Sequence, residues 1–361
     1  MHFLQHQGAA AGRGSYASSL SSLNWVERAR SAIARLINAP AADDIALMQS
    51  GTHSLNEALH GVLQARAHVI TTAIEHNSVL RPLEHMRKQG LISLDVVGCD
   101  STGWVNPQDL FKVRRSETKL LAMSHASNVT GTIQDIESVG AWCRANEIIF
   151  LVDAAQTMGY WPIDVENCGI DYLAAPGHKG LGGILGTGFL YLKNSRQASH
   201  QPLMLGGTGS QSESLLPHLP WPQKVEAGNL NLPGIVSMAK GAEILLAENA
   251  ELRVAQIVRG VCRLKELLAQ FPSLQTYGPA EAGKQVSVVS WRHPTWEPTE
   301  VAAVLDAEFG IEVRAGLHCS ALVHTYLGSE IGGTVRVSFG HTLTEEFLGK
   351  LASAVEAVAS C

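Results

Sequence analysis

The sequence predicts an α/β fold in which a large domain with a mostly parallel sheet flanked by helices is followed by a smaller α+β domain. Short apolar runs typical of buried strands alternate with segments of helical periodicity. One run, residues 148–152, is followed directly by Asp153. Open α/β sheets bind ligands at the carboxyl ends of their strands, so this acid marks the expected edge of the site. We place the large domain, including the N-terminal segment, at residues 1–247 and the small one at 248–361.

The elements follow from these two periodicities. Strands in the large domain are expected at 45–48, 67–71, 91–97, 120–123, 148–153, 172–175 and 188–192. Helices are expected at 25–36, after residue 53, within 102–113, at 134–146 and at 235–252. The small domain should contain a helix at 254–269, strands at 286–291 and 334–339, and a final helix from about residue 344.

Composition excludes several classes of protein. The chain has 361 residues, of which 45% are hydrophobic and 17% charged, enough for a sizeable core. The net charge is −6 and the sequence contains no block of like charges, so we expect neither a nucleic-acid nor a membrane partner. The six cysteines include no close pair, which argues against a zinc site or a disulfide framework. With no segment of transmembrane length or signal-peptide pattern, a cytoplasmic protein is expected.

A single lysine is the first candidate for chemistry. The strand at 172–175 stops at Pro176 and is followed by His178, Lys179, a glycine-rich stretch and the strand at 188–192. A lysine between two buried strands is costly to desolvate unless it is neutralised or covalently engaged. A desolvated amine is a good nucleophile towards carbonyl groups. Lys179 therefore predicts a Schiff base with an aldehyde cofactor, and a solvated loop lysine remains the alternative.

The acid at the end of the preceding strand fits the same chemistry. Pyridoxal phosphate needs a carboxylate beside its protonated ring nitrogen, because the charged ring is the electron sink of its reactions. Asp153 could supply that carboxylate, one strand before Lys179. A helix cap that follows a strand is the alternative for Asp153.

The segment Val-Asp-Ala-Ala-Gln at 152–156, followed by Gly-His-Lys at 177–179, resembles the fold-type I pyridoxal phosphate enzymes of aminotransferase class V, in the cysteine desulfurase and selenocysteine lyase branch. The other motifs of this family occur in its order: Gly-Thr-His at 51–53, Glu-His-Asn at 75–77, Ser-Asn-Val-Thr-Gly-Thr at 127–132, Glu-Ala-Gly at 226–228 and Arg-Ala-Gly-Leu-His-Cys at 314–319. The match covers nearly the whole chain.

The resemblance implies roles in cofactor binding. The loop before the second helix would hold the phosphate, His76 would stack on the ring, and Asn128 would lie near the phenolic oxygen and the substrate carboxylate. The residues implied to bind pyridoxal 5'-phosphate are Thr52, His53, His76, Asn128, Asp153, Gln156, His178, Lys179, Thr208 and Asn229. Without the family, His76 would be assigned to a capping loop, and the phosphate loop to an ordinary strand-to-helix turn.

Thr208 and Asn229 imply a homodimer, because in the family these loops approach the phosphate of the neighbouring subunit. The sequence departs from the family at Pro176, where serine is usual, and at Asn229, where threonine is usual. Proline removes two donors from the phosphate site, whereas the asparagine amide can still donate. The family's Asp-Asn-Ala-Ala-like stretch before Gly12 has no counterpart here, so we expect either a truncated start or a pocket open on one side.

Two candidates lie in the small domain. Arg336 in Thr-Val-Arg-Val-Ser-Phe is costly in a strand unless paired, and a substrate α-carboxylate would be a bidentate partner. The alternative is an outward-facing residue on an edge strand. Cys319 resembles the desulfurase cysteine that attacks the substrate sulfur, although a lone cysteine is more often a buried structural thiol. The role of His318 is left open.

The predicted function is a pyridoxal phosphate-dependent cysteine desulfurase that converts L-cysteine to L-alanine, with selenocysteine lyase activity also open. The catalytic residues would be Lys179, which removes the Cα proton, Cys319, which takes the sulfur as a persulfide, and His76. A sulfur-acceptor protein is an expected partner. The alternatives are another class V reaction, an aminotransferase or β-lyase, and a non-catalytic sulfur-transfer scaffold. A nucleotide-binding Rossmann enzyme is disfavoured, because no Gly-x-Gly-x-x-Gly opens a helix after the first strand.

Overall fold

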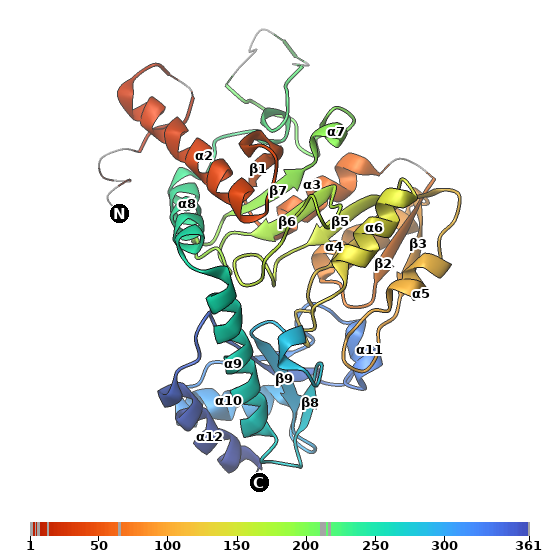
Figure 1. Ribbon diagram of the computed structural model, residues 1–361, viewed down its shortest axis with the longest axis vertical. Helices are drawn as coiled ribbons and strands as arrows, with labels where there is room; N and C mark the ends of the chain where they lie inside the picture. The colour runs from red at the N-terminus through yellow and green to blue at the C-terminus, as the bar shows by residue number, and fades with distance from the viewer. Residues whose placement is uncertain are drawn as a thin grey trace.

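The computed structural model describes residues 3, 5, 8–12, 14–63, 66–209, 214–215 and 218–359. Its centre is a seven-stranded sheet in the order β1-β7-β6-β5-β4-β2-β3 (Figure 1). Only β7 runs against its neighbours, so the expected mostly parallel α/β sheet is confirmed. The strands are β1 (Ile45–Met48), β2 (Ala67–Thr72), β3 (Ile92–Val97), β4 (Thr118–Ser124), β5 (Ile149–Asp153), β6 (Tyr172–Pro176) and β7 (Gly188–Leu192).

Helices cover both faces of this sheet. Against one face pack α2 (Ala17–Leu36), α5 (Pro107–Lys112), α6 (Ile136–Ala145) and α8 (Leu232–Ala247), and against the other α3 (Gly51–Val62) and α4 (Asn77–Lys88). Central strands are buried on both faces and are therefore apolar throughout, as in β6 and β7. Each helix instead buries one stripe; α3, for example, buries Leu55 and Leu59.

A second, four-stranded antiparallel sheet forms the C-terminal part, in the order β10-β11-β9-β8. Its elements are α9 (Ala250–Leu268), β8 (Gln275–Tyr277), β9 (Val288–Arg292), α10 (Pro298–Phe309), β10 (Arg314–Gly316), α11 (Val323–Leu327), β11 (Thr334–Ser338) and α12 (Glu345–Ala359). Helix α9 runs from the end of α8 towards this sheet (Figure 1). The proposed domain boundary at 248 falls between these two helices.

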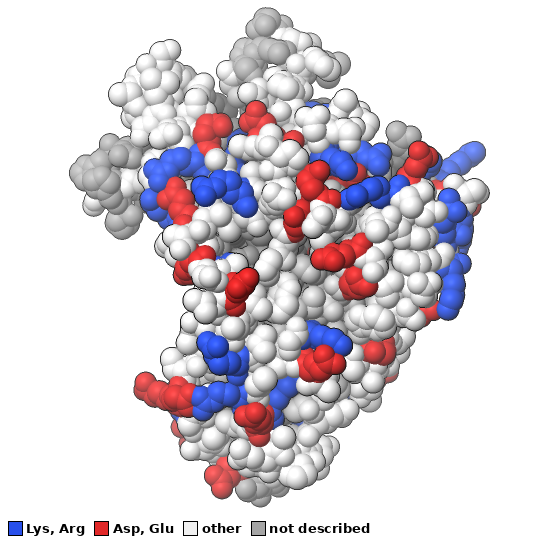
Figure 2. Space-filling model, viewed as in Figure 1, with Lys and Arg blue, Asp and Glu red and all other residues white. Residues whose placement is uncertain are grey.

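Short elements complete the description. They are α7 (Asn194–Gln197) and the 3₁₀ turns η1 (Ala42–Asp44), η2 (Gln223–Val225) and η3 (Ala282–Lys284). On the face shown in Figure 2, basic and acidic side chains are interspersed. Among the helices that the structure describes, each is too short or too polar to span a bilayer.

The strand register sets the position of the site. Ser124 at the end of β4 lies beside Asp153 at the end of β5, and Asp153 lies beside Ala174 of β6. The polar residues that follow β2, β4, β5 and β6 therefore emerge along one edge of the sheet. The turn that begins at Asn128 also meets the second sheet there, since Arg336 Nη1 of β11 donates to the Asn128 carbonyl at 2.9 Å.

Candidate active site

A cavity of about 250 Å³ lies at this edge of the large sheet. The structure places seven of the predicted site residues along its wall: Thr52, His76, Asn128, Asp153, Gln156, His178 and Lys179. They come from the start of α3 and from the segments that follow β2, β4, β5 and β6. The rest of the wall is Ser50, Gly51, Leu55, Ser78, Ser124, Ala126, Ala155, Pro176 and Arg314.

Burial opposes charge on the two central groups. Burial raises the pKa of Asp153 and lowers the pKa of Lys179, and each partly offsets the shift of the other by attraction. The positive charges of Arg336 and Arg314 further lower the pKa of Lys179. The backbone N–H of Ala155 donates to Asp153 Oδ1 at 2.9 Å and fixes the carboxylate. Lys179 is thus a weakly basic amine, and the charged form of Asp153 is stabilised by a cationic neighbour.

His76 serves as the N-cap of α4 and also lines the cavity. Its Nδ1 accepts from the Ser78 backbone N–H at 3.0 Å. A backbone N–H can only donate, so Nδ1 carries the lone pair and the neutral ring is protonated at Nε2. Burial lowers the pKa of His76 and favours this neutral form. The capping role and a role at the cavity are therefore compatible.

Ser78 is a site residue that sequence reasoning missed. Its hydroxyl lies 2.8 Å from Thr52 Oγ1 and 2.9 Å from His76 Nδ1. Because Nδ1 accepts, the Ser78 hydroxyl donates to the ring and is left to accept from Thr52. This chain connects the start of α3 to the face of the cavity that His76 forms.

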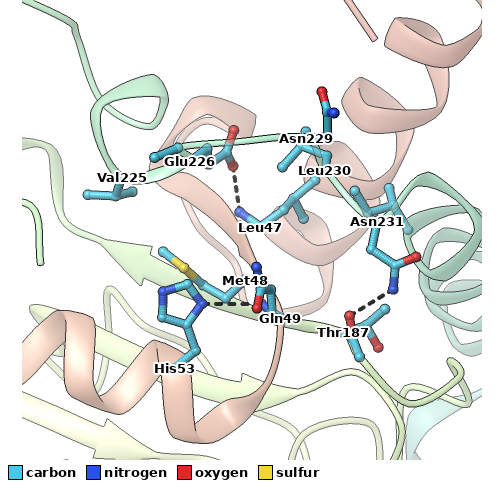
Figure 3. Close-up of a pocket in the computed structure, with 13 residues that line it drawn as sticks. Leu47, Met48, Gln49, His53, Thr187, Val225, Glu226, Asn229, Leu230 and Asn231 are labelled. Carbon is cyan, nitrogen blue, oxygen red and sulfur yellow. Dashed lines mark hydrogen bonds between the residues drawn. The ribbon is translucent and has the colours of Figure 1, made fainter. Parts of the chain in front are cut away.

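Two of the predicted residues line a second cavity, of about 280 Å³, and not the first (Figure 3). His53 and Asn229 line it from opposite sides. Glu226 closes part of the wall: it accepts from the Leu47 backbone N–H at 2.6 Å and forms a buried ion pair with Arg30 at 2.6 Å. The structure does not bring His53 and Asn229 to the cavity that Lys179 lines.

His53 follows Thr52 in the first turn of α3, and successive helical side chains are rotated by about 100°, so the two residues point to different cavities. Thr208 lies in a loop that touches the Glu-Ala-Gly segment, where the Gly228 backbone N–H donates to the Gly207 carbonyl at 2.8 Å. Thr208 lines neither of these two cavities.

Arg336 lies on an interior strand, because β11 pairs with both β10 and β9; the edge-strand alternative is wrong. The residue directly opposite on β10 is Arg314. Burial and the charge of Arg314 lower the pKa of Arg336 to about 10. Arg336 Nε is buried and has no partner among the described residues, and no carboxylate of those residues pairs with its guanidinium. Two adjacent guanidinium groups beside Lys179 attract an anion.

Cys319 occupies the turn between β10 and α11, and it is half-buried. Arg314 Nη2 lies 3.1 Å from its sulfur. Both His318 (φ 52°) and Cys319 (φ 62°) adopt the left-handed conformation that disfavours side chains other than glycine. Because Arg314 also lines the Lys179 cavity and lies directly opposite Arg336, its contact with the sulfur brings the thiol to the same region as both groups.

Glu75, immediately before His76, is fully buried beneath the site and was not among the predicted residues. Its carboxylate accepts from Thr72 Oγ1 at 2.6 Å, from the Ser124 backbone N–H at 2.9 Å and from Ser124 Oγ at 2.8 Å. It therefore joins the segment after β2 to the end of β4. Burial raises the pKa of Glu75 to about 7, although the hydrogen bonds oppose this and the charge of Asp153 adds to it.

This pKa predicts a pH-dependent stability. The folded state holds the Glu75 proton more tightly than the unfolded state, whose pKa is near 4.5, so the residue's contribution is full below pH 4.5 and is lost as the pH rises through 7. The loss amounts to about 3 kcal/mol at most. Glu75→Gln keeps the shape without the charge, so its stability relative to the unmutated protein should be higher at pH 8 than at pH 5. Urea unfolding measures this, and an equal difference at both pH values would contradict the assignment.

Comparison with known proteins now adds to this geometry. The aminotransferase class-V profile matches residues 1–351. The chain belongs to the class-V aminotransferase family. It is 33% identical to a probable cysteine desulfurase of Methanothermobacter thermautotrophicus over 99% of this chain and 89% of the relative. It is 34% identical to a probable cysteine desulfurase of Pyrococcus abyssi, over 96% and 88%.

A solved structure extends the likeness of this class-V member to three dimensions. The apo structure of a cysteine desulfurase from Thermococcus onnurineus matches with a TM-score of 0.93 and 30% identity, over 99% of this chain and 90% of that one. The resemblance on which the sequence interpretation depends is confirmed. As a class-V protein the chain is a pyridoxal phosphate-dependent enzyme.

The residues present fit that cofactor. In the first turn of α3 the His53 N–H donates to the N-cap Ser50 Oγ at 3.1 Å, whereas the N–H groups of Gly51 and Thr52 precede the first intrahelical hydrogen bond; at the positive dipole end they suit a phosphate. Gly51 at this turn lies against Pro176, since a Cβ there would be 3.0 Å from Pro176 Cδ and 3.2 Å from its backbone nitrogen. Asp153 suits the pyridinium nitrogen, and Lys179, with its lowered pKa, suits the aldehyde carbon. Pyridoxal phosphate supplies the electron sink that makes the Cα proton of an amino acid removable.

Proposed function

We propose that this class-V enzyme is a cysteine desulfurase that converts L-cysteine to L-alanine and retains the sulfur as a persulfide on Cys319. The observation that carries the proposal is the shared location of the cavity lysine, two arginines and a cysteine thiol. Arg314 contacts the thiol and lines the cavity of Lys179, and Arg336 lies directly opposite Arg314 on the neighbouring strand. The relatives that carry this name match nearly the whole chain.

Arg336 would bind the substrate α-carboxylate. Its unpartnered buried Nε and its proximity to Arg314 favour a bidentate anion. A carboxylate held there directs the substrate amine and Cα into the cavity that Lys179 lines. Lys179 with its lowered pKa is then available as the base that takes the Cα proton.

Cys319 would act on the substrate sulfur. Its thiolate attacks substrate Sγ, an S–S bond forms, and the Cβ–S bond breaks with its electron pair left on the carbon side. Cβ then takes up a proton to become the methyl group of alanine, and His76 Nε2–H and Lys179 are the cavity groups proposed to supply it. L-cysteine and the Cys319 thiol thus give L-alanine and the Cys319 persulfide, and the atoms balance.

The link between Lys179 and the cofactor is testable before any turnover. The purified protein should absorb visible light, and borohydride should fix the cofactor on the peptide that contains Lys179, because that amine is the desolvated one in the cavity. Peptide mass mapping reads the result, with Lys193, at the end of β7 and outside the cavity wall, as an internal control. A cofactor fixed on another lysine, or none at all, would refute the assignment of Lys179.

We further propose a homodimer in which Asn229 serves the partner's phosphate. Asn229 lines a cavity other than that of its own Lys179, so its predicted role requires a second subunit. Light scattering should give twice the chain mass of 38.6 kDa. Asn229→Ala should weaken cofactor binding several-fold, because one phosphate donor is lost. A monomer with full cofactor occupancy would contradict this proposal.

Transfer of the sulfur would require an acceptor protein. The segment around Cys319 carries the exposed apolar side chains Leu317, Leu322, Tyr326 and Ile331, and the thiol itself is half-buried. We propose that the acceptor docks over this segment. Trapping a mixed disulfide between Cys319 and a protein thiol would identify it, and disulfides that form equally with Cys99 would argue against a specific acceptor.

A further inference from the structure

Asn128 uses its side chain in a way that its proposed role at the cofactor does not require. Its Nδ2 donates to the His318 carbonyl at 2.6 Å, and its Oδ1 accepts from Ser320 Oγ at 2.6 Å. A carbonyl can only accept, so the amide orientation is fixed by the His318 contact. The two bonds reach the residues on either side of Cys319.

The segment that these bonds hold is strained. His318 and Cys319 are consecutive residues in the left-handed conformation, which is unfavourable for residues other than glycine. Such a turn persists only where its surroundings fix it. The Asn77 backbone N–H supplies a further contact by donating to the Cys319 carbonyl at 2.7 Å. Asn128 and Asn77 both belong to the large sheet's edge, whereas the turn belongs to the second sheet.

Water cannot easily replace these contacts. Ser320 is fully buried and Asn128 is 7% exposed, so a lost bond would leave buried polar atoms unpaired. Asn128 is itself held rigidly, because Ser127 Oγ accepts from the backbone N–H groups of Val129 and Thr130, both at 3.2 Å. The Asn128 carbonyl also accepts from Arg336. One residue therefore touches both the carboxylate site and the turn that carries the thiol.

We infer that Asn128, through Ser320 and the His318 carbonyl, is a positioning residue that holds the Cys319 thiol at a fixed distance from the substrate sulfur bound at Arg336. The inference deepens the proposed desulfurase function and depends on it for the catalytic part. It also assigns a role to His318, whose Nε2 contacts the Thr334 carbonyl at 3.0 Å and anchors the turn to β11. Burial, followed by the charge of Arg336, lowers the pKa of His318 to about 3, so its ring is a neutral anchor.

The test is a double-mutant cycle of Ser320→Ala, Asn128→Ala and the double variant. Ser320→Ala should lower kcat for L-cysteine about fivefold to tenfold, as expected for one buried hydrogen bond. In the Asn128→Ala background the same change should have less than a twofold effect, since the bond is already gone. Turnover of L-selenocysteine by Ser320→Ala should change less than threefold, because selenium can leave without attack by a thiol. Effects that multiply, or an equal loss on both substrates, would overturn the inference.

Hydrogen exchange of residues 316–321 in the cofactor-loaded protein tests the positioning directly. Ser320→Ala should raise exchange there about tenfold. The matched control is Ser19→Ala on α2, which removes an equally buried serine hydroxyl that donates to the Ala10 carbonyl at 2.9 Å. It should leave exchange at 316–321 unchanged. Equal exchange in both variants would refute the inference, and this result is independent of activity. Ser320→Ala could raise exchange while neither the variants nor the unmutated protein release alanine. In that case the desulfurase proposal fails, and the role of Asn128 in holding the turn stands.

Discussion

Cys319→Ala should abolish alanine formation from L-cysteine while it spares much of the turnover of L-selenocysteine. A C–S bond does not break readily in this reaction unless a thiol accepts the sulfur, whereas selenium can leave by elimination. The alanine side chain retains the Cβ and removes only the sulfur that Arg314 contacts. The measurement is alanine released from each substrate by the same preparation, with cofactor occupancy checked by absorbance.

The matched control for this variant is Cys262→Ala, because Cys262 is a free cysteine on α9, outside the cavity. It should leave both activities unchanged. If Cys319→Ala consumes L-cysteine at the unmutated rate, the persulfide mechanism fails, and a β-lyase or aminotransferase assignment replaces it.

Arg336→Ala should impair both substrates, since each presents the same α-carboxylate. The expected loss in kcat/KM is about 2–5 kcal/mol, or roughly thirty-fold to several thousand-fold, as for a partner removed from a buried charge pair. Part of that loss would come from the Asn128 carbonyl, which would be left without its donor. Arg336→Lys keeps the charge and loses the bidentate geometry, so its kcat/KM should lie between that of Arg336→Ala and that of the unmutated enzyme.

Steady-state kinetics on both amino acids measures this effect, and the loss should appear with cofactor absorbance unchanged. Equal kcat/KM in Arg336→Ala and the unmutated enzyme would show that another group binds the carboxylate. Arg314, directly opposite on β10, would then be the first candidate.

Much of the fold was predictable because its signals are local. The long apolar runs of β6 and β7 identify buried strands, and the periodicity of α9 identifies a helix. The strands β8 and β10 were missed, because three residues are too few to show the alternation of apolar and polar side chains that identifies a strand. The division into two domains at 248 remains a prediction.

The site was predictable only where the family motif or a strand end marked it. Asp153 and Lys179 follow buried strands, so sequence position already indicates the sheet edge. Ser78 and Ser320 were missed because their partners come from other segments and no local pattern identifies them. Glu75 and Arg314 stand in quoted family motifs but were given no role, because their contacts with Ser124 and Cys319 appear only in the folded chain. His53 was assigned to the same site as Thr52 because the two are neighbours in the sequence. The rotation between successive helical residues directs their side chains to different cavities.

The most direct test of the central claim is the mass of the Cys319 peptide after the enzyme has reacted with L-cysteine in the absence of any reductant or acceptor. The account predicts one additional sulfur atom on that peptide, with alanine released in equal amount. Peptides that contain Cys99, Cys143, Cys168 or Cys262 should remain unmodified. Alanine released without sulfur on Cys319, or free sulfide and pyruvate in place of alanine, would contradict the account.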